Sequence, residues 1–318
     1  MKLRASVRGV GHALPVRIMP NSELETLVDT SDAWIRQRTG IAERRISSEG
    51  ETTSSLCCTA ALEALENAGI AGSEIELIVC ATVTPDHPSP ATACLVQRAI
   101  GAPPRTACFD ISAACAGFIY ALDVAASMIE TGRFKTAVVL GADTLSRYVD
   151  WKDRNTCVLF GDAAAGVVLQ ADESGRGVLH TVLFSDGTGA DLIRVEPESQ
   201  AAGTRIEMVG AEVYRFAVGA MGEACDRVLK EAGLESSDID LFVPHQANLR
   251  IIESAAKRLK LDPEKVFLNV DRYGNTSGGS IPLALYEAVE TGRLLPGMRV
   301  MTVGFGAGLV WGANVIRW

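Results

Sequence analysis

Residues 68–79 read AGIAGSEIELIV, and residues 232–243 read AGLESSDIDLFV, 164 positions further on. In both stretches an Ala-Gly pair, typical of a helix end, is followed by a polar turn and then by a run of apolar residues. Each stretch therefore predicts the end of a helix and the start of a strand. The repetition indicates that the chain contains one structural unit twice.

A second pair of matching segments occurs in the same order. Residues 130–134 read ETGRF and residues 290–294 read ETGRL, 160 positions apart, and a strand-like run follows each of them. Both halves alternate β-branched runs with stretches of helical length, which is the pattern of α/β layers. We therefore predict an α/β fold of two similar halves, residues 1–172 and 173–318, packed together with a crevice between them.

Composition excludes several classes of protein. The chain has 318 residues, 47% hydrophobic and 22% charged, with a formal net charge of −9. No apolar run approaches the ~20 residues of a membrane span, and the N-terminal segment lacks the apolar core of a signal peptide, so we expect a soluble cytoplasmic protein. The negative charge disfavours nucleic acid as a partner. The 8 cysteines of the chain form no Cys-x-x-Cys pair, so the sequence gives no indication of a disulfide framework or a zinc site.

Residues 109–120 read FDISAACAGFIY and contain a candidate nucleophile, Cys115. The thiol lies in a small-residue bend between a strand-like run and a helical stretch. At such a helix N-terminus, unpaired N–H groups and the helix dipole favour the thiolate. The neighbouring Ala and Gly residues leave room for a substrate. Taken alone, the pattern is also typical of a buried structural cysteine.

Two segments of the second half complement Cys115. The strand-like run 240–243 leads directly into PHQAN, which places His245 at the carboxyl end of a strand, where open α/β sheets hold their sites. Residues 273–280, YGNTSGGS, form a glycine-rich turn before a helix. The 160-residue offset carries Cys115 onto Asn275, so the duplication predicts that they face each other across the crevice. Taken singly, the histidine and the turn are equally consistent with structural roles.

Five segments together carry a family resemblance: SDAWIRQRTGI at 31–41, DISAACAGF at 110–118, PHQAN at 244–248, GNTS at 274–277 and GFGAG at 304–308. They resemble β-ketoacyl-acyl carrier protein synthase III, the initiating condensing enzyme of type II fatty-acid synthesis, over nearly the whole chain. The resemblance implies the thiolase-like fold, with two duplicated halves in αβαβα layers, and a homodimer. Elongating synthases would require a second His at the site, and thiolases a second Cys.

The resemblance also implies roles for individual residues. Cys115 would carry the acyl group, and the backbone N–H groups of Cys115 and Ala307 would form the oxyanion hole. His245 and Asn275 would hold the enolate oxygen formed when a malonyl thioester loses CO₂. Phe305 would provide an apolar wall beside the malonyl carboxylate.

The substrates implied are an acyl-CoA and malonyl-acyl carrier protein, with no cofactor and no metal. By the same mapping, Trp34 and Arg154 would clamp the adenine of CoA, and Arg38 would lie near its phosphates. The pantetheine tunnel would be lined by Met208, Tyr214, Ala247 and Asn248. On the helical segment that follows, Arg250 and Lys257 share a face, and we expect them to dock an acidic carrier protein. Taken alone, that segment is also typical of a solvated amphipathic helix.

Two positions depart from the family pattern and leave alternatives open. Ser89 stands where a neighbouring subunit often contributes Phe to the acyl pocket, which leaves starter specificity undecided, and Asn155 replaces a frequent Gly. A condensing enzyme or acyltransferase of secondary metabolism remains an alternative. 3-Hydroxy-3-methylglutaryl-CoA synthase is disfavoured because residues 81–84 lack its Glu. A Cys/His thioester hydrolase and a silent binding member of the fold are two further hypotheses.

Overall fold

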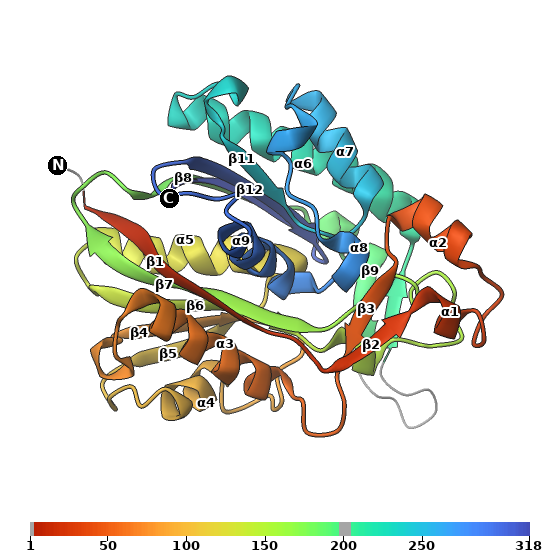
Figure 1. The fold of residues 1–318 in the computed structure, drawn as a ribbon, viewed down its shortest axis with the longest axis horizontal. Helices are drawn as coiled ribbons and strands as arrows, with labels where there is room; N and C mark the ends of the chain where they lie inside the picture. Colours follow the sequence, from red (N-terminus) through yellow and green to blue (C-terminus); the bar gives the residue numbers. More distant parts are fainter. Residues whose placement is uncertain (1–2, 197–204) are drawn as a thin grey trace.

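The computed structural model describes residues 3–196 and 205–318, and its two main β-sheets form separate layers (Figure 1). Strands of the first sheet come from the N-terminal half, in the order β1 (Arg4–Ala13), β7 (Ala163–Asp172), β6 (Thr136–Asp143), β4 (Leu77–Ala81) and β5 (Ala107–Ile111). Strands of the second sheet come from the C-terminal half, in the order β11 (Leu241–Pro244), β12 (Arg299–Gly306), β13 (Val310–Arg317) and β8 (Gly177–Ser185).

Helices fill the three other layers (Figure 1). Between the sheets lie α5 (Gly117–Glu130) and α9 (Ser280–Glu290), whose apolar side chains join those of both sheets in one core. The outer face of the first sheet is covered by α3 (Thr53–Ala68) and α4 (Thr92–Ala99). The outer face of the second is covered by α6 (Gly210–Ala232) and α7 (Leu249–Arg258). The predicted αβαβα layering is therefore confirmed.

The position of each helix follows from its apolar pattern. In α5, 8 of 14 residues are buried, because a helix between two sheets must be apolar almost all round. In α7, by contrast, only Ile251, Ile252 and Ala255 are buried, which is the single stripe of a helix with one solvated face. Among the helices of residues 3–196 and 205–318, none has both the length and the apolarity needed to cross a membrane.

Shorter elements pack beside the layers, at the right of Figure 1. They comprise two antiparallel strand pairs and three helices: β2 (Arg17–Pro20) with β3 (Glu43–Ile46), β9 (Ile193–Glu196) with β10 (Arg205–Met208), α1 (Asn21–Leu24), α2 (Asp32–Thr39) and α8 (Val270–Tyr273). Because several of their side chains line the cavities described below, these elements enclose the site.

The internal repeat has an offset of 163 at the site, not the predicted 160. α5 begins at Gly117 and α9 at Ser280, and the 3₁₀ turns that precede them begin at Ala114 and Ser277. α5 has 14 residues but α9 has 11, and this difference of three produces the offset of 160 seen at their ends. The duplication therefore pairs Cys115 with Gly278. Asn275 lies three residues earlier and still reaches the same cavity.

Candidate active site

Cys115 lies in the 3₁₀ turn between β5 and α5, where the chain reverses sharply. The preceding Ala114 has φ 45°, in the left-handed region that a small residue tolerates best. Gly306, at the end of β12, passes so close that a Cβ there would lie 2.6 Å from the backbone nitrogen of Cys115. The thiol itself is 8% exposed, and its sulfur lies 3.3 Å from Oγ of Ser277.

Burial controls the charge of this thiol. Desolvation raises the pKa of Cys115 to about 12, although hydrogen bonds with Ser277 and Asn275 oppose the shift. Desolvation therefore opposes the helix N-terminus, which the sequence argument expected to favour the thiolate. The resting residue is a thiol at neutral pH.

His245 follows β11 directly, and its ring is fixed from one side. Its backbone N–H donates to the Val303 carbonyl at 2.8 Å, and ring Nδ1 lies 2.8 Å from Oγ of Ser280. The other ring nitrogen, Nε2, is buried and has no hydrogen-bond partner among the described residues. Burial lowers the pKa of His245 to about 3, so the imidazole is neutral.

Asn275 is held by its backbone and by half of its side-chain amide. Its N–H donates to the Leu159 carbonyl at 2.8 Å, and its Oδ1 accepts the N–H of Ser277 at 2.8 Å. Since the oxygen is occupied, the amide presents its NH₂ group to the site. Asn275 and His245 therefore offer two uncharged donors.

The predicted reacting residues share an outer cavity of 350 Å³. Cys115, His245, Asn275 and Phe305 line its inner end. All seven residues expected to bind CoA line the same cavity: Trp34, Arg38, Arg154, Met208, Tyr214, Ala247 and Asn248. The tertiary structure thus brings together segments from both halves of the chain.

A second, inner cavity of 240 Å³ also reaches Cys115. Its walls are largely apolar and include Ala307, the predicted oxyanion-hole residue. The other lining residues were not predicted from the sequence: Val83, Ala114, Leu145, Phe160, Ile193, Arg194, Val195, Ile206 and Ser277. They come from seven separate segments, so no local pattern could have found them. Ser89 is exposed and does not line this cavity.

Comparisons with known proteins identify the family. The family model described as 3-oxoacyl-[acyl-carrier-protein] synthase III matches residues 109–187, and the model of its C-terminal part matches residues 229–318. A β-ketoacyl-[acyl-carrier-protein] synthase III of Symbiobacterium thermophilum is 52% identical, over 100% of this chain and 99% of that protein. The chain belongs to the 3-oxoacyl-[acyl-carrier-protein] synthase III family.

Solved structures agree with this assignment. The family's enzyme from Aquifex aeolicus matches with a TM-score of 0.94 and 45% identity, over 99% of this chain and 100% of that one. The priming β-ketosynthase of the R1128 polyketide pathway matches with a TM-score of 0.94 and 34% identity, over 98% of this chain and 96% of that one. The thiolase-like fold is thus confirmed. So is the predicted activity, that of a condensing acyltransferase that initiates fatty-acid synthesis.

In this synthase the two residues expected to clamp adenine contact each other. The guanidinium carbon of Arg154 lies 4.9 Å from the ring centroid of Trp34, and that of Arg38 lies 5.9 Å from it. A base stacked between ring and guanidinium needs about 7 Å, twice a van der Waals contact. Adenine could therefore enter only after Arg154 moved off the indole.

Arg250 and Lys257, the expected docking residues, are both exposed on α7. The guanidinium carbon of Arg250 lies 5.2 Å from the ring centroid of Tyr214, which lines the outer cavity. Arg250 thus stands at the cavity mouth, while Lys257 lies two turns further along the helix. Among the described residues, no cluster of three or more His, Cys, Asp or Glu side chains could hold a metal ion.

Proposed function

We propose that this synthase transfers an acyl group from a CoA thioester to Cys115 and then condenses it with malonyl-acyl carrier protein. The observation that carries the proposal is the position of the Cys115 sulfur at the junction of two cavities. The outer cavity has the volume and residues for a pantetheine arm, and the inner one is apolar enough for an acyl chain. A thioester bound along both would have its carbonyl at the sulfur.

In the first half-reaction, the sulfur forms a bond to the thioester carbonyl carbon and the bond to the CoA sulfur breaks. The oxygen of the tetrahedral intermediate is proposed to accept from the N–H groups of Cys115 and Ala307. The close approach of Gly306 to the backbone of Cys115 supports this arrangement, because it brings the end of β12 against the nucleophile turn.

In the second half-reaction, the malonyl carboxylate leaves as CO₂ and its electron pair forms an enolate. The enolate carbon then attacks the acyl group, the bond to Cys115 breaks, and the thiolate left on Cys115 takes a proton from solvent to restore the thiol. His245 Nε2 and the Asn275 amide are proposed to donate to the enolate oxygen. Both are uncharged, so they stabilise the oxygen without readily protonating the carbanion. Phe305, which packs against His245, supplies the apolar wall that disfavours a carboxylate.

The proposed partners are acyl-CoA and malonyl-acyl carrier protein, with docking through Arg250 and Lys257. No cofactor or metal is proposed, since a thiol and neutral donors suffice for both half-reactions. The site takes Cys115 from the proposed half 1–172 and His245 and Asn275 from 173–318. All 8 cysteines are free thiols, which supports the proposed cytoplasmic location, where thiols stay reduced.

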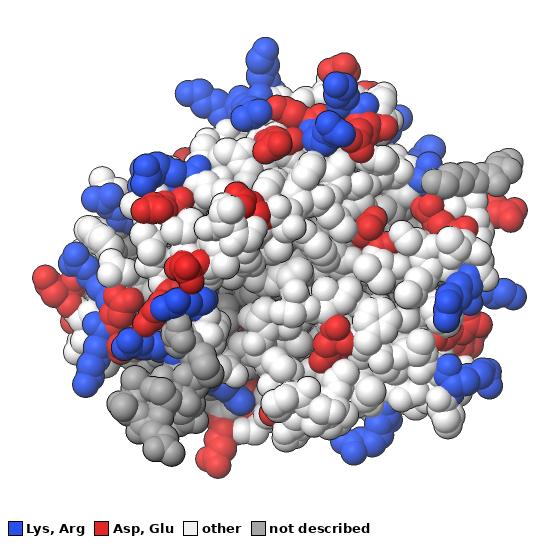
Figure 2. Space-filling model, turned by 180° about the vertical axis from the view of Figure 1, so that it is seen from behind, with Lys and Arg blue, Asp and Glu red and all other residues white. Residues whose placement is uncertain are grey.

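A homodimer is proposed from two features. β5 is an edge strand of the first sheet, and in the described part of the chain nothing pairs with its outer edge. An unpaired edge is a template for another strand. Figure 2 shows a broad face with few Lys, Arg, Asp or Glu side chains between charged margins. Such a weakly charged surface is suited to contact with a second copy.

The proposal is tested by following each half-reaction with intact-protein mass spectrometry. Acetyl-CoA should add one acetyl group to the wild-type chain and to Cys225→Ala, a control that removes another buried thiol. Cys115→Ala should gain none. His245→Ala and Asn275→Ala should acylate but consume malonyl-carrier protein more slowly, by about 10²-fold if one oxyanion donor is lost. Acetylation of Cys115→Ala would overturn the assignment, and free acetate without CO₂ would indicate a hydrolase.

The alternative, a priming synthase of secondary metabolism, is favoured by one observation, the R1128 priming ketosynthase at 34% identity. The two assignments differ in the acyl group accepted. A panel of acetyl-, butyryl-, hexanoyl- and octanoyl-CoA, compared by kcat/KM, separates them. Preference for acetyl-CoA supports the primary pathway, and preference for longer acyl groups supports the alternative.

A further inference from the structure

Two buried serines, one at the start of α9 and one in the 3₁₀ turn before it, contact the two proposed reacting side chains. Oγ of Ser277 lies 3.3 Å from the sulfur of Cys115, and Oγ of Ser280 lies 2.8 Å from Nδ1 of His245. Both serines are 1% exposed. One short segment thus holds the nucleophile and the donor, and neither hydroxyl has a role in the mechanism described above.

The hydrogen bonds of Ser280 determine where His245 carries its proton. Its Oγ accepts the N–H of Gln246 at 2.8 Å, and in the described residues Nδ1 is the one acceptor within reach of its O–H. A buried hydroxyl left without an acceptor costs about 1–3 kcal/mol. Ser280 therefore donates to Nδ1, and the neutral ring carries its hydrogen on Nε2. This is the nitrogen that has no partner in the described structure.

Ser277 contacts Cys115 and Asp143, not His245. The thiol of Cys115 donates to its Oγ, and the Ser277 hydroxyl favours the charged form of the Asp143 carboxylate beside it. Asp143 is 0% exposed. Its Oδ2 also accepts the N–H of Gly278 at 3.1 Å, and its Oδ1 accepts the N–H of Val83 at 2.8 Å. The polar groups of Cys115, Ser277 and Asp143 thus form a row from the thiol to a buried carboxylate.

We propose that Ser277 and Ser280 are positioning residues that each serve one half-reaction. Ser277 directs the proton of Cys115 to Asp143 during acylation, and Ser280 keeps the hydrogen of His245 on Nε2 for condensation. In acylation the sulfur of Cys115 forms a bond to the carbonyl carbon. The thiol proton moves to Ser277 while the hydroxyl proton of Ser277 moves to Asp143. When the CoA thiolate departs, the proton returns to it along the same path. The inference rests on the proposed function.

The two serines serve as controls for each other. Ser277→Ala should slow acylation by acetyl-CoA at least about 10-fold, while acyl-enzyme prepared by long incubation reacts with malonyl-carrier protein at the wild-type rate. Ser280→Ala should acylate at the wild-type rate and condense about 10²-fold more slowly, since a donor is misdirected. If either variant loses both half-reactions equally, its serine is merely structural and the proposal fails.

A backbone control is needed at Ser277, because its φ is 51°. Gly adopts this conformation without strain. Ser277→Gly should acylate as slowly as Ser277→Ala, since both lack the hydroxyl. Recovery of acylation in the Gly variant would show that strain, not the hydroxyl, had slowed the Ala variant, and would overturn the role of Ser277.

The tautomer can be read without substrate, and the wild-type chain alone is enough to test it. In ¹⁵N-histidine-labelled wild-type chain, the His245 ring should show a protonated Nε2 and an unprotonated Nδ1, and Ser280→Ala should lose this preference. A wild-type ring protonated on Nδ1 would overturn the role of Ser280. Failure of the wild-type chain to acylate would sink the proposed function but leave this measurement intact, so the two failures are distinguishable.

Discussion

The ring of Phe305 packs edge-on against the imidazole of His245, with ring centroids 5.6 Å apart and planes inclined at 68°. The aromatic edge and the cavity wall exclude water from His245, which is 1% exposed. An imidazole in such surroundings can hardly be charged. The contact therefore keeps His245 a neutral donor over the whole physiological pH range.

This burial links the protonation of His245 to stability. The pKa of His245 is about 3 in the folded chain and returns to about 6.5 on unfolding. Between these values the unfolded chain binds more protons, so the free energy of unfolding falls as the pH falls, by up to about 1.4 kcal/mol per unit. His245→Gln should lack this contribution. Urea unfolding of both proteins at pH 6.5, 5.5 and 4.5 measures the difference, and parallel pH dependences would contradict it.

The thiol of Cys115 should react slowly with alkylating agents. Because burial raises its pKa to about 12, its thiolate fraction increases about tenfold per pH unit throughout the neutral and mildly alkaline range. The rate of iodoacetamide labelling at Cys115, followed by peptide mass spectrometry from pH 7 to 10, should rise with that slope. A plateau below pH 8 would show that the N-terminus of α5 outweighs desolvation after all.

Gly306→Ala should disrupt the nucleophile turn. The added Cβ would lie 2.6 Å from the backbone nitrogen of Cys115 and 2.9 Å from the Cβ of Ala114. We expect a loss of about 1–3 kcal/mol in the free energy of unfolding, from overpacking, together with loss of acylation. Gly219→Ala, at an exposed position of α6 with open space around it, should instead gain about 0.5–1 kcal/mol. Equal stability of the two variants would argue against the close approach.

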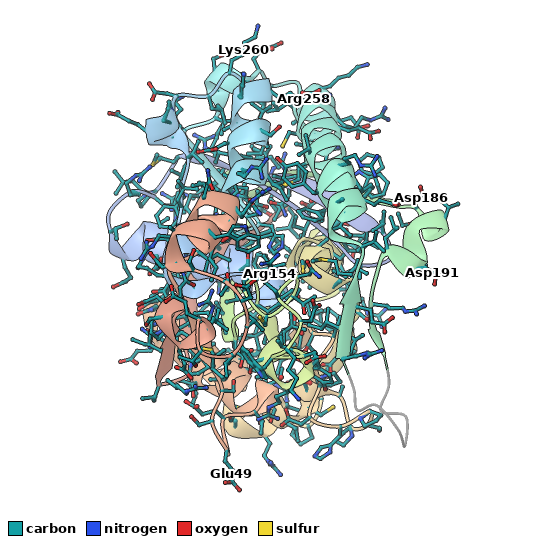
Figure 3. All side chains as sticks on the ribbon, turned by 90° about the vertical axis from the view of Figure 1, so that its right-hand side faces the viewer. Glu49, Arg154, Asp186, Asp191, Arg258 and Lys260 are labelled. Carbon is teal, nitrogen blue, oxygen red and sulfur yellow. The ribbon has the colours of Figure 1, made fainter. Side chains whose placement is uncertain are left out.

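Reversing the charge of Arg250 should affect the carrier-protein substrate selectively. Arg250→Glu should raise the KM for malonyl-carrier protein and weaken its dependence on salt, while acylation by acetyl-CoA changes little. Lys260→Glu is a matched control, because Lys260 lies at the upper end of the molecule in Figure 3, away from Arg154 of the outer cavity. Equal loss with both substrates would place Arg250 in the CoA site instead.

The inner cavity should decide starter length. Leu145→Phe adds an aromatic ring to a cavity of 240 Å³ and should shift preference toward acetyl-CoA, by about 10-fold or more per carbon removed. Ser89→Phe is the informative companion. Ser89 is exposed in the single chain, so it can restrict the cavity only if a second copy carries it there. An unchanged kcat/KM profile in Ser89→Phe would exclude that contribution, and an unchanged profile in Leu145→Phe would exclude this cavity as the acyl site.

The sequence by itself determined the duplicated α/β layers and the positions of the proposed reacting side chains along the chain. Both follow from local rules. Repeated turn and strand patterns mark the same unit twice, and residues at strand ends and helix starts reach the site because those ends converge. Cys115 after β5 and His245 after β11 were predictable in this way, as was Asn275 before α9. The exact offset between the two halves was not predictable. α9 is three residues shorter than α5, and the loop after α9 is three residues longer than the loop after α5.

Only the tertiary structure decided the protonation states of the site residues and the shape of the cavities. The pKa of Cys115 depends on desolvation by surrounding segments, which overrides the local helix N-terminus that the sequence made visible. The inner cavity is assembled from eight segments, and the contacts of Ser277 with Cys115 and of Ser280 with His245 span 162 and 35 residues. Burial and hydrogen-bond direction are properties of packing between distant parts, so they arise only when the chain is folded.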